Sequence, residues 1–190
     1  IGRKRLYAVE KAGKTIDLES GAGIKDAIGK VTQHRNGLEM ITEIPIDLGV
    51  AGADIKGGGG DNQAIGLTSK KAYITQLTTA KFGRITEIRA ICLEDGGADI
   101  NFVVGSDDVN TGQGPAGAVE LVAAIGNDLG EDKSAVSTDI MAVDGNGMQD
   151  SGNEWYLYMC NDGGGGHGSA SINGSKFLLY IHGFEEPSDL

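Results

Sequence analysis

The stretch from Gly83 to Gly105 constrains the fold more than any other part of this chain. It contains two apolar runs separated by Asp95-Gly96-Gly97, three residues that supply the positive-φ positions of a tight reversal. In the second run apolar and polar residues alternate, and this period of two predicts a half-buried β-strand. The stretch therefore predicts a β-hairpin, with one face formed in the first run by Thr86, Ile88, Ala90 and Cys92 and in the second by Ile100, Phe102 and Val104.

Seven further runs have the length and composition of β-strands, and polar or glycine-rich loops separate most of them. They are residues 6–9, 40–48, 71–80, 119–125, 135–143, 154–160 and 176–184. The run at 154–160 is apolar on both faces, which is typical of a central strand, whereas Pro45 indicates an edge strand or a bulge. A short helix is predicted only over residues 24–31, where Gly29 disfavours it.

This number of strands, with no long helix, predicts an all-β fold. We expect a two-sheet antiparallel β-sandwich of the jelly-roll type with an extended N-terminal arm. An immunoglobulin-type sandwich is the alternative, but its Cys–Trp–Cys order is not met, because Trp155 follows Cys92 and lies almost next to Cys160. Both cysteines lie in strand-like apolar runs, which favours buried free thiols over a disulfide.

Charge is distributed unevenly along the chain. Residues 1–36 hold eight basic and four acidic residues, a net charge of +4, whereas the remaining residues hold eight basic and 23 acidic ones, a net charge of −15. The first 36 residues also contain too few large apolar side chains to form a core of their own. We therefore expect a basic extended arm at 1–36, lying on its own body or on a neighbouring subunit, a β-sandwich domain at 37–185 and a polar tail at 186–190.

No pattern in the sequence favours catalysis. A catalytic triad needs a histidine positioned beside a nucleophile, but His34, His167 and His182 lie beside no nucleophile-elbow pattern. Adjacent acids such as Glu94-Asp95 are the residue type of a glycosidase site, but ten aromatic residues with a single Trp offer little surface for sugar stacking. We therefore expect no enzymatic activity.

Other ligands are also weakly supported. Asp108 with Asn110, and Asp144 with Asn146, place oxygen atoms at alternate positions as calcium loops do, but neither run continues into the full calcium-loop pattern, so tight turns explain them more simply. No glycine run leads into a phosphate-binding loop, and no apolar run approaches the roughly 20 residues of a membrane span. The acidic body disfavours nucleic acid. We expect no cofactor, no metal, no membrane contact and no nucleic-acid partner, with calcium left open at the two loops.

Several stretches, taken in order, resemble a family of structural proteins from marine tailed bacteriophages, including T7-like cyanophages. They are SGAGI, ITEIPIDLGV, IGLTSKKAYITQLTTAKFGRITEIRAICLEDGGADINFVVGSDD, EWYLYMCNDGGGG and KFLLYIHGFE. The resemblance spans Ser20 to Glu185, and residues 111–153 depart most from it. The family resembles capsid decoration (cement) proteins, so the likeness implies a β-sandwich body on the outside of the phage head and carries no catalytic motif.

The resemblance implies a non-enzymatic virion protein, made in the host cytoplasm, that decorates the outer capsid surface by binding the major capsid protein. Neighbouring copies are the second expected partner, and a homotrimer is one possible arrangement by analogy. The charge pattern adds five basic residues of the arm as expected capsid contacts: Arg3, Lys4, Arg5, Lys11 and Lys14. The alternative is a receptor- or carbohydrate-binding head fibre that uses exposed loops near Tyr156, Tyr158 and His167.

Overall fold

The computed structural model of the chain describes residues 13–49, 55–57, 62–94, 100–125, 134–137, 154–161 and 174–185. Two short helices are described, the 3-10 helix η1 (Lys25–Ala27) and α1 (Thr79–Phe82). The strands are β1 (Lys14–Thr15), β2 (Thr32–Asn36), β3 (Glu39–Asp47), β4 (Ile55–Lys56), β5 (Gly66–Leu67), β6 (Thr75–Gln76), β7 (Arg84–Glu94), β8 (Ile100–Gly105), β9 (Val119–Ile125), β10 (Ser134–Ser137), β11 (Tyr156–Asn161) and β12 (Lys176–Phe184). The fold of these residues is therefore all-β, as predicted.

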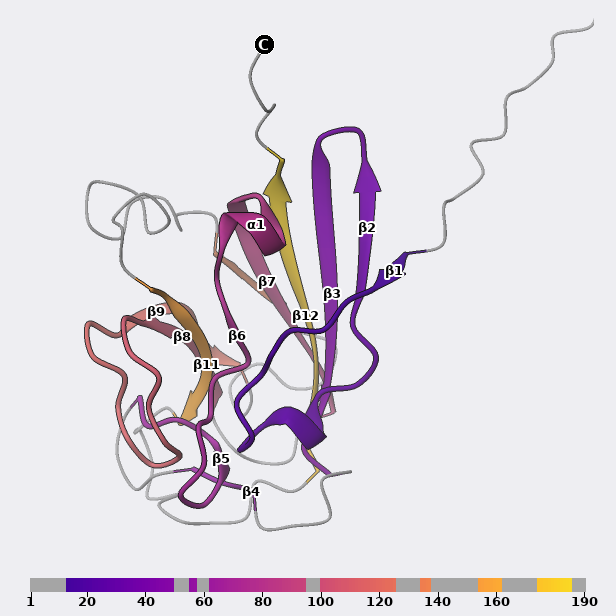
Figure 1. The fold of residues 1–190 in the computed structure, drawn as a ribbon. Helices are drawn as coiled ribbons and strands as arrows, with labels where there is room; N and C mark the ends of the chain where they lie inside the picture. Colours follow the sequence, from indigo (N-terminus) through magenta and orange to yellow (C-terminus); the bar gives the residue numbers. More distant parts are fainter. Residues whose placement is uncertain are drawn as a thin grey trace, which may run out of the picture.

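The strands form antiparallel sheets. A six-stranded sheet has the order β1-β2-β3-β12-β7-β10, and a four-stranded sheet has the order β6-β11-β8-β9. Strands β4 and β5 form a small third sheet. Figure 1 shows the long strands β3, β12 and β7 side by side, with β8, β9 and β11 beside them as a second group.

Four strand pairs are nested one inside another along the chain. β8 pairs with β9, β7 with β10, β6 with β11 and β3 with β12. Each pair encloses the preceding one in sequence, and successive pairs alternate between the four-stranded and the six-stranded sheet. The chain is therefore folded as one long hairpin that is wound back on itself.

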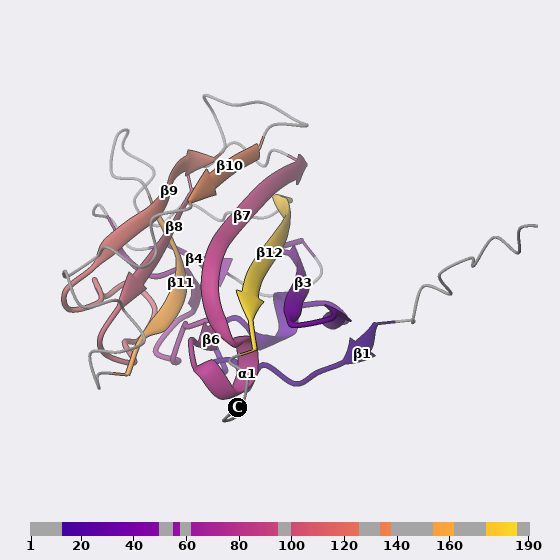
Figure 2. The same cartoon turned by 90° about the horizontal axis from the view of Figure 1, so that it is seen from above.

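The two large sheets share one hydrophobic core. Buried residues of the six-stranded sheet, including Ile44 and Leu179, belong to the same cluster as Val104 and Leu157 of the four-stranded sheet. Across this core the rings of Phe102 on β8 and Phe177 on β12 pack edge to face, with centroids 5.9 Å apart and planes at 80°. Figure 2 shows the two groups of strands from above, facing one another.

The stretch 83–105 contains two strands, but the predicted hairpin between them was wrong. β7 lies in the six-stranded sheet and β8 in the four-stranded sheet. β8 is also buried on both faces, because Val103 packs with Tyr158 and Cys160 on the side away from the main core. The Asp-Gly-Gly turn signals a reversal of the chain, but such a reversal can lead into a facing sheet as well as into a paired strand.

The predicted alternation of side chains is confirmed along most of the long strands. In β3 the residues at 40, 42, 44 and 46 are buried and the intervening ones are partly exposed. In β7 Ile88, Ala90 and Cys92 are buried as predicted, but Thr86 is exposed and Ile85 is buried instead. The pairing of β7 with β12 shifts register between His182 and Gly183, and this bulge reverses the side-chain alternation at the start of β7.

Residues 13–36 are part of the body of the protein. β2 pairs with β3 over five residues, so the predicted boundary at residue 36 falls at the turn of a hairpin. Leu18, Ile24, Ala27 and Val31 are buried in the core that both sheets share. The sequence left open whether this segment lies on its own body or on a neighbouring subunit. The structure places residues 13–36 on the chain's own body.

Local predictions near Pro45 and in two short segments need correction. β3 is an internal strand, but Pro45 lies beyond the last β2–β3 pair, where its carbonyl accepts a hydrogen bond from the Gly29 N–H at 2.8 Å. Proline has no N–H to donate to a neighbouring strand. Because β2 has already ended at this position, no β2–β3 hydrogen bond is lost. The run 71–80 forms a strand only at Thr75–Gln76, and the predicted helix is reduced to Lys25–Ala27. The predicted strand at 6–9 lies outside the described residues.

Candidate docking surfaces

Only one of the five predicted basic contact residues lies in the part of the chain that the structure describes. Lys14 is exposed on β1, the edge strand of the six-stranded sheet. Arg3, Lys4, Arg5 and Lys11 lie outside the described residues. The surface beside Lys14 is therefore the part of the predicted contact that the structure describes.

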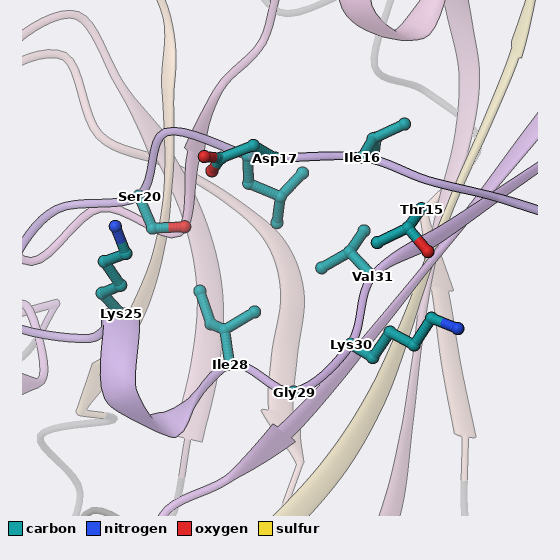
Figure 3. Close-up of a pocket in the computed structure, with 10 residues that line it drawn as sticks. Thr15, Ile16, Asp17, Ser20, Lys25, Ile28, Gly29, Lys30 and Val31 are labelled. Carbon is teal, nitrogen blue, oxygen red and sulfur yellow. The ribbon is translucent and has the colours of Figure 1, made fainter.

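A pocket of about 310 Å³ lies next to Lys14 at this edge of the sheet. The segment that follows β1 and the segment that precedes β2 are joined by a hydrogen bond of 3.3 Å from the Ile16 N–H to the Val31 carbonyl. Beyond this bond the two segments separate, and the pocket lies between them. In Figure 3 the side chain of Ile28 points into the space between these segments. The lining residues are Thr15, Ile16, Asp17, Leu18, Ser20, Lys25, Ile28, Gly29, Lys30 and Val31.

The chemistry of this edge pocket is apolar at its base and charged at its rim. Lys25 and Lys30 are exposed and bring two positive charges, and the single acid of the lining is Asp17. The lining contains no aromatic ring on which a sugar could stack. The edge pocket therefore favours an anionic group and repels a basic one.

The face of the six-stranded sheet that points away from the shared core, here called the outer face, carries an unusual mixture of side chains. Pro45, Leu178 and Ile91 lie opposite one another on β3, β12 and β7 and form one apolar row. The neighbouring row is Glu43, Tyr180 and Arg89, and the next is Ile41, His182 and Glu87. Leu93 at the end of β7 is 48% exposed. An apolar row framed by charged and polar side chains is typical of a protein-binding surface.

Charged groups fix both ends of the outer face. Lys176 donates to Glu94 at 2.5 Å and lies 4.0 Å from Asp47, and the hydrogen bond to Glu94 raises the pKa of Lys176. His182 lies between two carboxylates, with Nδ1 3.9 Å from Glu39 and Nε2 4.0 Å from Glu87.

In the row between these two groups, partial burial, and secondly the charge of Glu43, raise the pKa of Tyr180. Tyr180 therefore keeps its hydroxyl proton at neutral pH. It offers a hydrogen-bond donor at the centre of the outer face.

The aromatic residues that the carbohydrate alternative needed are not equally available. Tyr158 is fully buried, so it cannot line a binding loop. Tyr156 is partly exposed and its ring lies 5.1 Å from that of Tyr73. Its hydroxyl donates to Glu154 at 2.7 Å, and this hydrogen bond is the main cause that raises the pKa of Tyr156 to about 12. His167 lies outside the described residues.

Replacing Tyr158 by phenylalanine is expected to destabilise the protein by about 2 kcal/mol. The Tyr158 hydroxyl donates to the carbonyl of Asp107 and accepts from the N–H of Val109 at 3.0 Å, so its removal leaves both backbone groups without this partner. Urea unfolding measures the loss. The matched variant Tyr156→Phe, whose hydroxyl bonds an exposed carboxylate, should cost less than about 1 kcal/mol; equal losses would contradict a structural role for the Tyr158 hydroxyl.

The calcium alternative gains no support from the described loop. Asp108 forms an ion pair of 3.0 Å with Lys71, and the N–H of Asn110 donates to Gln113 at 3.0 Å as in a tight turn. Asp144 and Asn146 lie outside the described residues. Among the residues with assigned positions, no three histidine, cysteine or acidic side chains gather closely enough to hold a metal ion. Cys92 and Cys160 are buried, are not joined in a disulfide, and pack in different clusters.

The described part of the chain contains no helix that is long and apolar enough to cross a membrane. Comparisons with protein-family models, with curated proteins and with solved structures find no match to this chain.

The outer face was not identified from the sequence, although a signal for it was present. The positions of β3 that alternate with its buried residues read Glu-Ile-Glu-Pro-Asp, and those of β12 read Lys-Leu-Tyr-His-Phe. Apolar residues on the exposed side of two strands are informative only when the strands are known to be neighbours. The paired residues of β3 and β12 are 129 to 145 positions apart in the sequence, so their neighbourhood follows from the structure alone.

Proposed function

We propose that this chain is a non-enzymatic virion protein that decorates and stabilises the outer surface of a phage capsid. It binds the major capsid protein and neighbouring copies of itself. The observation that carries a protein-binding role is the outer face, where an apolar row crosses three strands and charged residues frame it. The phage assignment rests on the sequence resemblance from Ser20 to Glu185.

We also propose that the body is a jelly-roll β-sandwich. In a jelly roll, eight strands form two Greek keys in two facing sheets. Four nested pairs, assigned alternately to the two sheets, support this topology, because they are what results when a long hairpin is wound into two layers. Jelly rolls are frequent in viral capsid and lectin domains, so the topology suits a shell protein without deciding its ligand.

The distribution of charge supports attachment in many copies. The acidic body keeps decorated particles apart in solution, whereas the basic amino-terminal residues can reach an acidic neighbour. A single contact of this kind is weak, but a protein bound at many sites on one particle gains strength from avidity.

Deleting residues 1–12 is expected to lower retention on purified phage heads by roughly a hundredfold, because a multivalent attachment is lost. The deletion stops at residue 12, since residues 13–36 contribute β1, β2 and four core residues. Co-sedimentation with heads that lack the protein measures binding, and far-ultraviolet circular dichroism checks that the body still folds.

Full retention of the shortened protein would contradict a role for the amino-terminal residues. Failure of the complete chain to bind heads would contradict the capsid assignment itself. Binding of the complete chain to a glycan array, together with a low copy number on the particle, would favour the head-fibre alternative.

A further inference from the structure

We propose that the outer face of the six-stranded sheet receives residues 1–12 of a neighbouring copy, so that copies are linked by their amino-terminal segments. The inference deepens the proposed function by naming one partner of the segment. Its test uses the purified protein without phage heads, so it succeeds or fails independently of the capsid assignment.

The outer face offers two kinds of surface along β3 and β12. Toward the β2–β3 turn, the carboxylates of Glu39 and Glu87 flank His182, and Glu43 lies in the next row. Toward the other end, Pro45 and Leu178 belong to the apolar row that continues to Ile91 and Leu93. β3 itself brings only carboxylates and apolar side chains to the outer face. The lysine and arginine side chains of this face lie on β7 and β12, and His34 of β2 lies opposite Ile41.

The amino-terminal segment has the complementary sequence in the complementary order. Its three adjacent basic residues, Arg3-Lys4-Arg5, are followed directly by the apolar run Leu6-Tyr7-Ala8-Val9. Seven extended residues span roughly 24 Å. The His182 and Leu178 rows are four residues apart on β12, or about 13 Å. One segment can therefore place its cations on the acidic half while its apolar run covers the apolar half.

The direction of β1 favours a neighbouring copy over the same chain. β1 runs antiparallel to β2, with Lys14 opposite Gln33 and Thr15 opposite Thr32, so the direction from Thr15 back to Lys14 points along β2 toward Gly37, at the end of the sheet. Docking on the chain's own outer face would require a complete reversal within residues 10–13. A copy placed beside this end of the sheet needs no reversal.

Charge also favours the outer face over the edge pocket as the surface that binds the amino-terminal segment. The edge pocket is lined by Lys25 and Lys30, which would repel Arg3, Lys4 and Arg5. Lys176, the cation of the apolar end of β12, is already bound to Glu94. Arg84 and Arg89 lie on β7, on the side of the outer face away from β3. The path along β3 is thus the acidic and apolar one.

Sedimentation equilibrium of the complete chain at low salt tests this proposal over about a hundredfold range of concentration, because association follows mass action. The wild-type chain should associate increasingly with concentration. Leu178→Lys should weaken association by about tenfold or more, since it places a cation in the apolar half of the receiving surface. The matched control is Leu38→Lys, at a residue that is 53% exposed in the β2–β3 turn and outside the paired rows, and it should associate like the wild type.

A charge exchange tests the pairing and does not depend on the stability of Leu178→Lys. The segment variant Arg3→Glu/Lys4→Glu/Arg5→Glu should lose association, and adding Glu39→Lys/Glu43→Lys on β3 should restore it. A wild-type chain that stays monomeric at every concentration would overturn the proposal. So would association that survives deletion of residues 1–12, which would indicate that two outer faces meet directly, or a charge exchange that restores nothing.

Discussion

Gly183→Ala is expected to lower the free energy of unfolding by about 3 kcal/mol, near the upper end of what overpacking costs. A Cβ atom at this position would lie 2.0 Å from the carbonyl oxygen of Phe82 and 3.1 Å from that of Arg84. Both are backbone atoms at the junction of α1 and β7, so no side-chain rotation relieves the overlap. Relief would require β12 to move away from the strands that it joins, and those pairings hold the centre of the six-stranded sheet.

Urea unfolding, followed by the fluorescence of the buried Trp155, measures this loss. The matched control is Gly114→Ala, where the nearest atom to the new Cβ lies at 3.7 Å. This variant should stay within about 0.5 kcal/mol of the wild type. Equal midpoints for Gly183→Ala and the wild type would contradict the close approach of β12 to the end of α1.

Phe102→Ala is expected to cost about 3–5 kcal/mol, as is usual when a large buried aromatic residue is removed. Its ring is fully buried and packs edge to face against Phe177 of the opposite sheet. The variant loses the burial of the ring, the aromatic contact, and the packing that joins the two sheets. Thermal or urea unfolding measures the loss directly.

Phe184→Ala is the control for this prediction, because Phe184 is 47% exposed and its removal should change stability by about 0.5 kcal/mol. A double-mutant cycle of Phe102→Leu and Phe177→Leu should give a coupling of about 1 kcal/mol. Additive effects of these two substitutions would show that the sheets are not held together by this pair.

The sequence was most informative about strands, because their side chains alternate. The burial of Ile44 and Ile46 on β3 was predicted from the alternation of apolar and polar residues. The internal position of β11 was predicted because its run is apolar on both faces. That signal is local, since each strand must bury one face or both. It failed at Thr86, where a bulge interrupts the alternation, and in β8, which is buried on both faces although its alternation predicted a half-buried strand.

Pairing between strands could not be predicted in the same way. The Asp-Gly-Gly turn favoured pairing of β7 with β8, but β7 pairs with β12 and β10, whose residues lie far along the chain. Residues 13–36 were expected to form part of an arm because they contain few large apolar residues. Leu18, Ile24 and Val31 are nevertheless buried in the core, where segments from elsewhere in the sequence supply most of the packing.

Of the candidate docking surfaces, only the charge contrast between the two partners could be predicted from the sequence. The contrast between a basic amino-terminal region and an acidic body is visible in the sequence, and Lys14 is indeed exposed. The outer face depends on Leu178 lying between Pro45 and Ile91, and no local pattern reports that arrangement. Tyr158 illustrates the opposite error. It was expected near an exposed binding loop, but it lies in the doubly apolar run 154–160, where its buried hydroxyl bonds the backbone of Asp107 and Val109.

The nested order of the strand pairs has a consequence for when the protein can become functional. β12 lies between β3 and β7, so the six-stranded sheet cannot be completed before residue 184 has left the ribosome. The innermost pair, β8 with β9, closes a short loop, whereas β3 with β12 closes almost the whole described chain and is therefore slow to form. The outer face, which needs β3, β12 and β7 together, is thus the last surface to appear, and a chain whose β12 has not yet left the ribosome cannot present it to a partner.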